Sequence, residues 1–237
     1  MKTSKIQPPK DIKLTADYDP AKLIWIPGTT TFISANQEFN GKTIKDAVYA
    51  AADNGLAVAG TSLFIPYLIN VVSSANGKTT LYDGKGNPLS KKNANDLYER
   101  LTAGCWINLA TYFKKNDDGH FHVETNYGIT SKNRFQGLFG ESVQSKVSPL
   151  EKCLMHVDDC RVDLDLKSFN KQGLAVKRSK DKEYQRGKNI HFYSPIDNAV
   201  SWFYADSGRA VLYCDGGQKD SFASLGVLVC AEGTPKN

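Results

Sequence analysis

The chain has 237 residues, of which 41% are hydrophobic and 23% are charged, and its formal net charge is +5 at pH 7. This balance is typical of a globular protein whose single elaborate domain, or two small ones, buries a sizeable core. It excludes a membrane-spanning chain, because the longest apolar run, 63–72, is interrupted by Pro66 and Asn70. The positive excess is mild and spread along the chain, which favours a solvated surface over nucleic acid or an anionic envelope as a partner.

The N-terminal residues predict an extended arm over 1–22, followed by a single domain over 23–237. The arm is rich in Lys and Pro. It also lacks the apolar segment of a secretory signal, so we expect synthesis in the cytoplasm without secretion.

The first half of the domain predicts two helices between short strands. Apolar residues recur at helical spacing over 43–58. A second helix starts near Ser90 or Asn93 and runs to about Phe113, with Leu97, Leu101, Cys105 and Leu109 on one face. The segment 63–72 is apolar and rich in strand-forming residues, and other strands are predicted at 23–26, 29–34, 79–82 and 120–127.

The second half predicts long insertions and then a terminal group of strands. From 128 to 187 the periodicity weakens, and Lys-rich stretches such as KRSKDKEYQRGK are typical of surface segments. Strands follow at 190–193, 202–203, 210–213 and 225–229. The predicted fold is therefore α+β, with two helices packed on antiparallel sheets and long irregular insertions.

The segment 198–230 combines a frame of small and apolar residues with intervening positions that share no chemistry. The frame includes Trp202, Phe203, Leu212 and Cys214. Aromatic, acidic and glycine residues occupy the other positions, as they do on adaptable binding surfaces. The predicted ligand-binding residues are Tyr204, Asp206, Gly208, Val211, Tyr213, Asp215, Gly216, Gly217, Asp220 and Phe222. We expect these positions to be exposed on the surface.

Three residues of the frame have a structural interpretation as well as a functional one. Arg209 is expected to pair with buried carbonyls or an acid, in preference to a ligand. Trp202 is expected in the core or as the floor of the display surface. Gly226 indicates a close approach of the backbone.

The run SWFYADSGRAVLYC, closed by ASLGVLV, resembles the C-terminal variable region of proteins diversified by diversity-generating retroelements. The likeness covers about the last fifth of the chain and is strongest to the archaeal and archaeal-virus group. It implies a C-type-lectin fold related to formylglycine-generating enzymes, with adenine-directed mutagenesis of the codons between frame residues. All ten predicted ligand-binding residues can arise when the first two bases of an Asn codon are randomised, whereas Gln218 and Lys219 cannot.

The resemblance implies a binding protein, without catalytic residues or a cofactor, whose ligand is a protein or glycan on a cell surface. Nucleic acid is not an expected partner. Two alternatives remain open: an enzyme related to the formylglycine-type oxidases, and a structural virion component. The oxidases need a closely spaced reactive Cys pair, which the distant Cys214 and Cys230 do not match. A disulfide between these two cysteines across the terminal hairpin is possible.

One cluster has residue types that bind metals. Cys153, His156 and Cys160 fall in one short run that also contains Asp158, Asp159, Asp163 and Asp165. Structural zinc usually has four ligands in two spaced pairs, and the acidic residues lack the spacing of a calcium loop. We therefore expect no metal. His120 and His122 alternate along a strand, so they face opposite ways and form no dyad.

Overall fold

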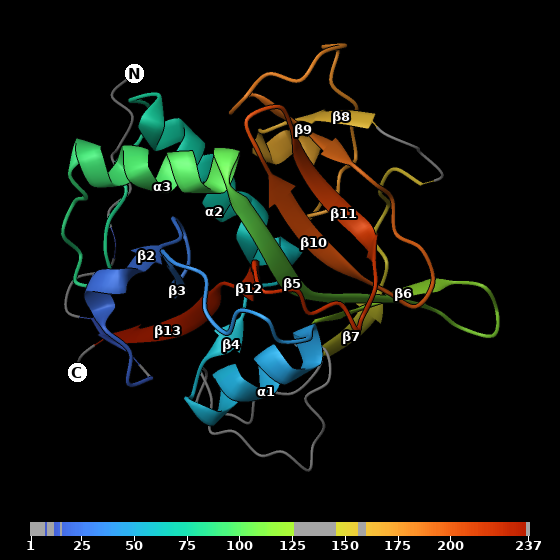
Figure 1. Ribbon diagram of the computed structural model, residues 1–237, viewed down its shortest axis with the longest axis horizontal. Coiled ribbons are helices and arrows are strands. Elements are labelled where there is room, and N and C mark those ends of the chain that lie inside the picture. Colours follow the sequence, from blue (N-terminus) through green and yellow to red (C-terminus); the bar gives the residue numbers. More distant parts are fainter. Residues whose placement is uncertain (1–7, 9–11, 15, 126–145, 156–159, 236–237) are drawn as a thin grey trace.

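The computed structural model describes residues 8, 12–14, 16–125, 146–155 and 160–235. Within these residues the protein is mixed α+β, with three α-helices and two sheets, the larger of which is strongly curled (Figure 1). The α+β prediction is confirmed. The predicted number of helices is wrong, because a third helix occupies the segment that was interpreted as strand-like.

The helices are α1 (Ile44–Asp53), α2 (Thr61–Ala75) and α3 (Lys91–Ala103), with 3-10 turns η1 (Pro20–Lys22) and η2 (Leu166–Ser168). Two of the helices begin at side-chain caps. The hydroxyl of Thr43 accepts a hydrogen bond from the backbone N–H of Asp46, and that of Ser90 accepts one from Asn93. Such caps satisfy backbone donors that have no partner within the helix.

The smaller sheet is antiparallel and is centred on the last strand of the chain. Its strands are β1 (Ile12–Leu14), β2 (Leu23–Trp25), β3 (Thr31–Ser34), β4 (Ala57–Val58) and β13 (Val229–Pro235). The order is β1-β13-β3-β2, and β4 also pairs with β13. The predicted N-terminal arm therefore contains one strand of this sheet.

The larger sheet has the order β7-β6-β5-β10-β11-β9-β8, and β12 also pairs with β5. Its strands are β5 (Cys105–Lys115), β6 (Phe121–Thr125), β7 (Lys146–Pro149), β8 (Cys160–Asp163), β9 (Asn189–Phe192), β10 (Ala199–Ala205), β11 (Ala210–Gly216) and β12 (Leu225–Val227). The β11–β9 and β12–β5 pairs are parallel, and the other pairs are antiparallel.

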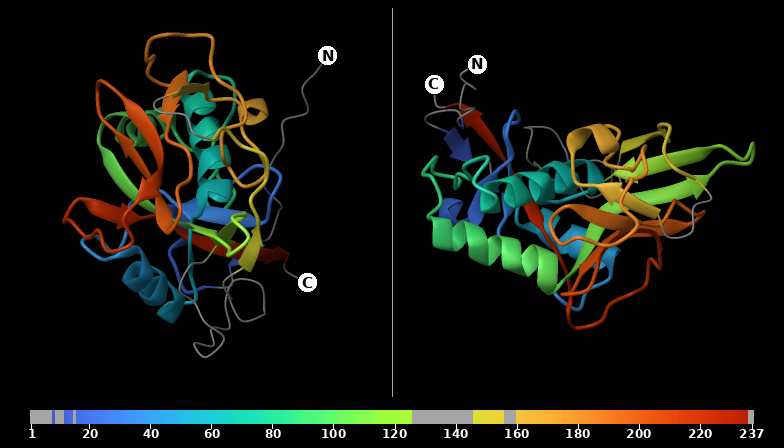
Figure 2. Two further views of the ribbon diagram at one scale, coloured as in Figure 1. Left: turned by 90° about the vertical axis from the view of Figure 1, so that its right-hand side faces the viewer. Right: turned by 90° about the horizontal axis from the view of Figure 1, so that it is seen from above.

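The core lies where the inner face of the larger sheet meets α2. This helix runs through the centre of the molecule (Figure 2) and buries residues around most of its circumference. Phe64 of α2 packs on Phe203 of β10, with ring centroids 4.8 Å apart, and both side chains are fully buried. This contact fixes which face of β10 points inward and which face points away from the core.

The prediction of a strand over 63–72 is wrong, since these residues belong to α2. A continuous apolar run is equally compatible with a buried helix and a buried strand. The second predicted helix is also too long: α3 ends at Ala103, and the following residues form β5. Gly104, with φ −174° and ψ 54°, separates the two elements.

The predicted insertions over 128–187 are described in part. Residues 126–145 and 156–159 lie outside the described residues. The described remainder supplies β7 and β8, which form the two edges of the larger sheet. These parts of the insertions therefore pack on the sheet.

No helix among the described residues combines the length and the apolar character needed to cross a membrane. The most apolar of them, α2, has only 15 residues. A helix needs about 20 residues to span the hydrocarbon core of a bilayer.

Candidate ligand-binding face

The strands β10 and β11 alternate between an inner and an outer face over most of their length, with a register shift between Val200 and Trp202. Phe203 on β10 and Leu212 and Cys214 on β11 are fully buried in the core. Tyr204 and Tyr213 lie between them in sequence, are half-buried and point away from α2. Successive side chains on a strand point to opposite faces. Half-burial of the sheet therefore produces the alternation of frame and intervening residues in this part of the sequence.

The outer face carries a continuous group of aromatic rings, which we call the aromatic face. It consists of Trp106, Tyr193, Trp202, Tyr204, Tyr213 and Phe222. These residues come from β5, β10, β11, the residue after β9 and the β11–β12 loop. They lie up to 116 positions apart in sequence and meet only through the pairing of the strands.

The rings contact one another in edge-to-face and stacked geometries. Trp106 lies opposite Tyr204 in the register, with ring centroids 4.1 Å apart. Phe222 meets Trp106 edge-on at 5.1 Å. Tyr213 stacks on Tyr193 at 5.0 Å. Aromatic pairs in such arrangements are each worth about 0.5–1.5 kcal/mol beyond their buried area, so the rings hold one another in place.

A polar corner closes the face at the β10–β11 turn. Tyr204 donates its hydroxyl hydrogen to Asp206, whose other oxygen accepts the backbone N–H groups of Gly208 and Arg209 at 2.8 Å each. The guanidinium carbon of Arg209 lies 5.2 Å from the ring centre of Tyr204. The hydrogen bond from Tyr204 holds the pKa of Asp206 below its ordinary value. The carboxylate therefore stays ionised at neutral pH.

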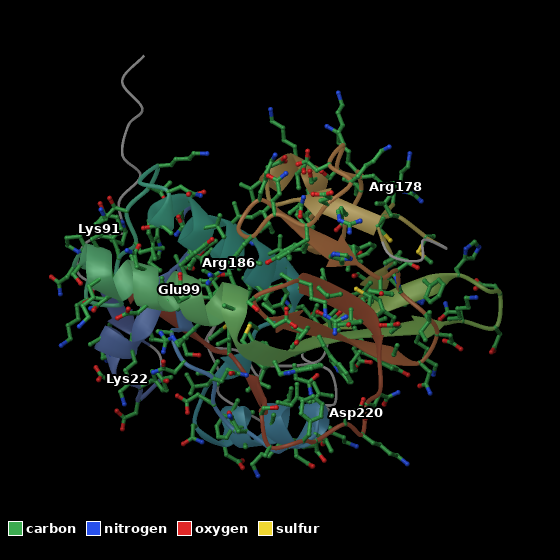
Figure 3. The ribbon with its side chains drawn as sticks, turned by 45° about the horizontal axis from the view of Figure 1, so that its top comes forward. Lys22, Lys91, Glu99, Arg178, Arg186 and Asp220 are labelled. Carbon is green, nitrogen blue, oxygen red and sulfur yellow. The ribbon has the colours of Figure 1, made fainter. Side chains whose placement is uncertain are left out.

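The β11–β12 loop folds over the other end of the face. Its Phe222 is 38% exposed although it contacts two tryptophans. The carboxylate of Asp220 accepts the backbone N–H of Gly217 at 3.2 Å. Asp220 lies near α1 at the lower edge of the molecule (Figure 3). Gly208 and Asp215 are also exposed.

The expectation of exposure fails at Val211 and Gly216. The side chain of Val211 is only 1% exposed and lies in register between Tyr204 and His191. Gly216 is buried under Trp202, and a Cβ added there would lie 2.5 Å from the Nε1 atom of Trp202. Neither position presents a side chain to solvent, so both act as frame residues in this fold.

Two polar side chains beneath the rings have buried atoms without hydrogen-bond partners. Asn108 is 1% exposed, and neither its amide oxygen nor its nitrogen has a partner. It lies in register between Trp202 and Val227. The Nε1 atom of Trp202 is likewise unpartnered. Each such group costs about 1–3 kcal/mol, so these two side chains are held by packing and by the pairing of their strands, without side-chain hydrogen bonds.

The structure changes the interpretation of two frame residues. Arg209 was expected to pair with buried carbonyls or an acid, and it does pair with an acid, its Nε atom lying 3.9 Å from Asp206, but it does so in an exposed position over the ring of Tyr204. Trp202 is half-buried at the centre of the aromatic face, in contact with Trp106 and Tyr213. The close approach at Gly226 involves Asn40 and Gln37, since an added Cβ would lie 2.4 Å from the side-chain oxygen of Asn40.

Three residues of the site escaped the sequence analysis: Trp106, Asn108 and Tyr193. The first two belong to β5, whose residues were assigned to a helix. Had these residues been predicted as a strand, the spacing of two between Trp106 and Asn108 would have placed both on one face of it. Tyr193 ends a predicted strand, but nothing in the sequence links it to Tyr213.

Among the described residues, the cysteines and acidic residues of the segment 153–165 do not form a metal-binding site. His156, Asp158 and Asp159 lie outside the described residues. Among the others, no group of three His, Cys, Asp or Glu side chains is arranged to hold a metal ion. All five cysteines are free, so the disulfide considered between Cys214 and Cys230 is not formed.

The fold and the site together define a mixed α+β protein whose curled sheet carries an exposed aromatic face. No known protein family, no curated protein and no solved structure matches this chain.

Proposed function

We propose that the protein is a non-enzymatic ligand-binding protein and that the aromatic face is its contact surface. The observation that carries the proposal is the outward group of six contacting rings, of which Phe222 remains 38% exposed. Tyr and Trp supply large contact areas with few rotatable bonds, which is why they dominate binding hot spots. The inner faces of the same strands are anchored on α2, so the surface is rigid.

The chemistry of the face favours a protein or glycan ligand on a cell surface. Flat rings stack on the C–H faces of sugars and on apolar protein groups, and Asp206, Asp215 and Asp220 surround them with hydrogen-bond acceptors. Only one cation, Arg209, lies in ring contact with the face among the described residues. This acidic border disfavours anionic ligands such as nucleic acid.

The finer proposal is a C-type-lectin fold whose display residues are diversified by a retroelement. Its support is that Tyr204, Tyr213 and Asp215 point outward while the intervening frame residues point inward, so substitutions at these positions leave the core intact. Val211 and Gly216 are removed from the display set because both are buried. The remaining display residues are Tyr204, Asp206, Gly208, Tyr213, Asp215, Gly217, Asp220 and Phe222.

The binding role is tested by screening the purified protein on a glycan array and on intact cells from its source environment. Tyr213→Ala and Phe222→Ala should each weaken any binding found by about tenfold or more, the scale of a hot-spot residue. Tyr82→Ala is the matched control, because Tyr82 is also half-buried and meets one tryptophan edge-on at 6.4 Å. Equal losses in the control and in the face variants would contradict the proposal.

The diversification is tested separately by sequencing the 3′ end of the gene across its source population. Substitutions should fall on the display positions and spare Val211, Gly216 and the inward frame. A near-copy of this region beside a reverse transcriptase gene, differing mainly at adenines, should accompany them. Uniformly low variation would leave a ligand-binding protein with a fixed specificity.

Cysteine burial weighs against the alternative of a formylglycine-type oxidase. Such chemistry needs a thiolate that substrate can reach. Cys214 and Cys230 are at most 1% exposed, and burial raises the pKa of both thiols well above the ordinary value. An oxidase activity abolished by Cys214→Ser, with the variant still folded, would reverse this conclusion.

A further inference from the structure

The positive charge of the protein is concentrated in one segment and is not spread along the chain as expected. Residues 177–188 carry six Lys or Arg and two acidic residues, a net charge of +4, against +5 for the whole chain. A local field of this kind attracts anions, whereas a scattered excess does not. The aromatic face makes no use of this segment.

The segment lines a cavity of about 450 Å³ between the C-terminal end of α2 and the end of β8. We call it the basic cavity. Its lining includes five cationic side chains: Lys78, Lys177, Arg178, Lys180 and Lys188. Arg178 lies beside β8, far from Asp220 at the opposite edge of the view (Figure 3). A volume of this size is within the range of small-molecule sites.

Most of these cations lack an internal partner. Lys188 pairs with Asp181 at 2.8 Å. Within the described residues, Lys78, Lys177, Arg178 and Lys180 form no ion pair and are exposed. Three carboxylates, Asp163, Asp165 and Asp181, line the same cavity, so the five cations leave it a net charge of +2, which favours an anion in the hollow.

The loop that carries these cations is held in place by hydrogen bonds to β8. The N–H of Ser179 donates to the carbonyl of Arg161 at 2.7 Å, and the N–H of Leu164 donates to the carbonyl of Lys188 at 2.8 Å. The cavity is therefore tied to the sheet at both ends of the loop. A preformed site loses less conformational entropy when a ligand binds.

The cavity also contains an acceptor that the protein does not use. Asp163 lines the cavity; its Oδ1 atom is buried beyond the reach of a ligand, so a hydrogen bond from a ligand would go to the other carboxylate oxygen, Oδ2. A carboxylate oxygen among cations accepts a hydrogen bond from a hydroxyl or amino group but repels a phosphate. The lining therefore matches a ligand that carries both anionic groups and hydrogen-bond donors.

We propose that the basic cavity binds a small phosphorylated ligand with hydroxyl groups, of the sugar-phosphate or nucleotide class. The phosphate contacts Lys177, Arg178 and Lys180, and a hydroxyl donates to Asp163. Phosphate groups favour such clusters because they accept several charge-assisted hydrogen bonds at once. A long nucleic acid fits less well, because the unpaired cations surround one hollow and do not form a track along the surface.

The test is calorimetric titration of the full chain with ribose 5-phosphate, adenosine 5′-monophosphate, pyrophosphate and unphosphorylated ribose. At least one of the two phosphorylated hydroxyl compounds should bind, and ribose should not. The triple variant Lys177→Gln, Arg178→Gln, Lys180→Gln should weaken that binding about tenfold or more, from the loss of three charge-assisted contacts. The matched control, with the same charge change, is Lys45→Gln, Lys91→Gln, Lys92→Gln on exposed positions of α1 and α3.

A second variant separates hydroxyl recognition from simple charge. Asp163→Asn removes a negative charge from the cavity, so pyrophosphate should bind more tightly than it does to the unmodified protein. The preference for ribose 5-phosphate over pyrophosphate should fall at least severalfold, because the amide is a weaker acceptor. Failure of both phosphorylated hydroxyl compounds to bind, or an equal loss in the control triple variant, would overturn the proposal. If only a single-stranded oligonucleotide bound, the proposal would also be overturned, and the cavity would instead be part of a nucleic-acid-binding surface.

Discussion

Replacing Gly216 by alanine tests whether the aromatic face rests on a tightly packed floor. A Cβ at this position would lie 2.5 Å from Nε1 and 2.6 Å from Cε2 of Trp202, and 2.9 Å from the carbonyl oxygen of Val200. The indole ring must therefore move. Overpacking of this kind costs about 1–3 kcal/mol, and alanine recovers about 0.5–1 kcal/mol of the cost of glycine in a strand. The expected net loss is about 1–2 kcal/mol.

The neighbouring glycine provides the control. A Cβ at Gly217 would also make a close contact, 2.6 Å from an oxygen of Asp220, but that oxygen ends a partly exposed side chain, which can turn away at the cost of one hydrogen bond of 3.2 Å. Gly217→Ala should therefore change the free energy of unfolding by no more than about 0.5 kcal/mol. Both glycines belonged to the predicted display set. Comparing the two variants therefore tests whether Gly216 is a buried frame residue and Gly217 an exposed display residue.

Urea unfolding followed by tryptophan fluorescence measures both variants. In a domain of this size, 1 kcal/mol corresponds to about 2–4 °C in Tm. In a Trp202→Ala background the cost of Gly216→Ala should fall by about 1 kcal/mol, because only the contact with Val200 remains. Equal costs for the two glycine variants, or no coupling to Trp202, would refute the packing argument.

Three further predictions concern the strands, the polar corner and the thiols. Tyr213→Ala should cost about 1–2 kcal/mol because its ring contacts two others, whereas Leu212→Ala on the inner face should cost about 2–5 kcal/mol in the same urea assay. Because the hydrogen bond from Tyr204 lowers the pKa of Asp206, the carboxylate stabilises the fold above its unfolded-state pKa of about 4, and this contribution is lost as pH falls through the lower folded pKa. Asp206→Asn should therefore flatten the acid limb of the stability curve, and an unchanged curve would argue against the hydrogen bond. Burial raises the pKa of Cys153 to about 11, so it should react with a disulfide reagent at pH 8 far more slowly in the folded protein than in urea.

The errors in the predicted fold have a common physical origin in ambiguous periodicity. Cys105 and Leu109 are four residues apart, a spacing that fits one face of a helix and also, being even, one face of a strand. Gly104 ends the helix between Leu101 and Cys105. This glycine predicts the end of the helix more strongly than the helical spacing of Cys105 and Leu109 predicts its continuation. The segment 63–72 has no periodicity at all, so only its packing against the larger sheet, as part of α2, decides its conformation.

The candidate site was predictable where it is local in sequence. Trp202, Tyr204 and Tyr213 follow from the alternation of two adjacent strands, which is visible in the sequence. Trp106 and Tyr193 join them through the register of β5 and β9, and no short-range pattern encodes that register. Burial at Val211 was equally hidden, because it depends on which residues of β9 and β10 lie beside it.

The placement of β12 and β13 makes both sheets depend on strands that follow the aromatic face in the sequence. β12 pairs with β5 in the larger sheet, and β13 pairs with β1, β3 and β4 in the smaller one. The larger sheet is complete only when β12 has been synthesised and the smaller sheet only when β13 has, and pairings this distant in sequence form slowly.

A stop codon or frameshift anywhere in 198–230 would remove the strand that unites the smaller sheet. Such a product would expose unpaired strand edges and be degraded. Under the proposed diversification of the display residues, only variants translated through to β13 would complete the smaller sheet.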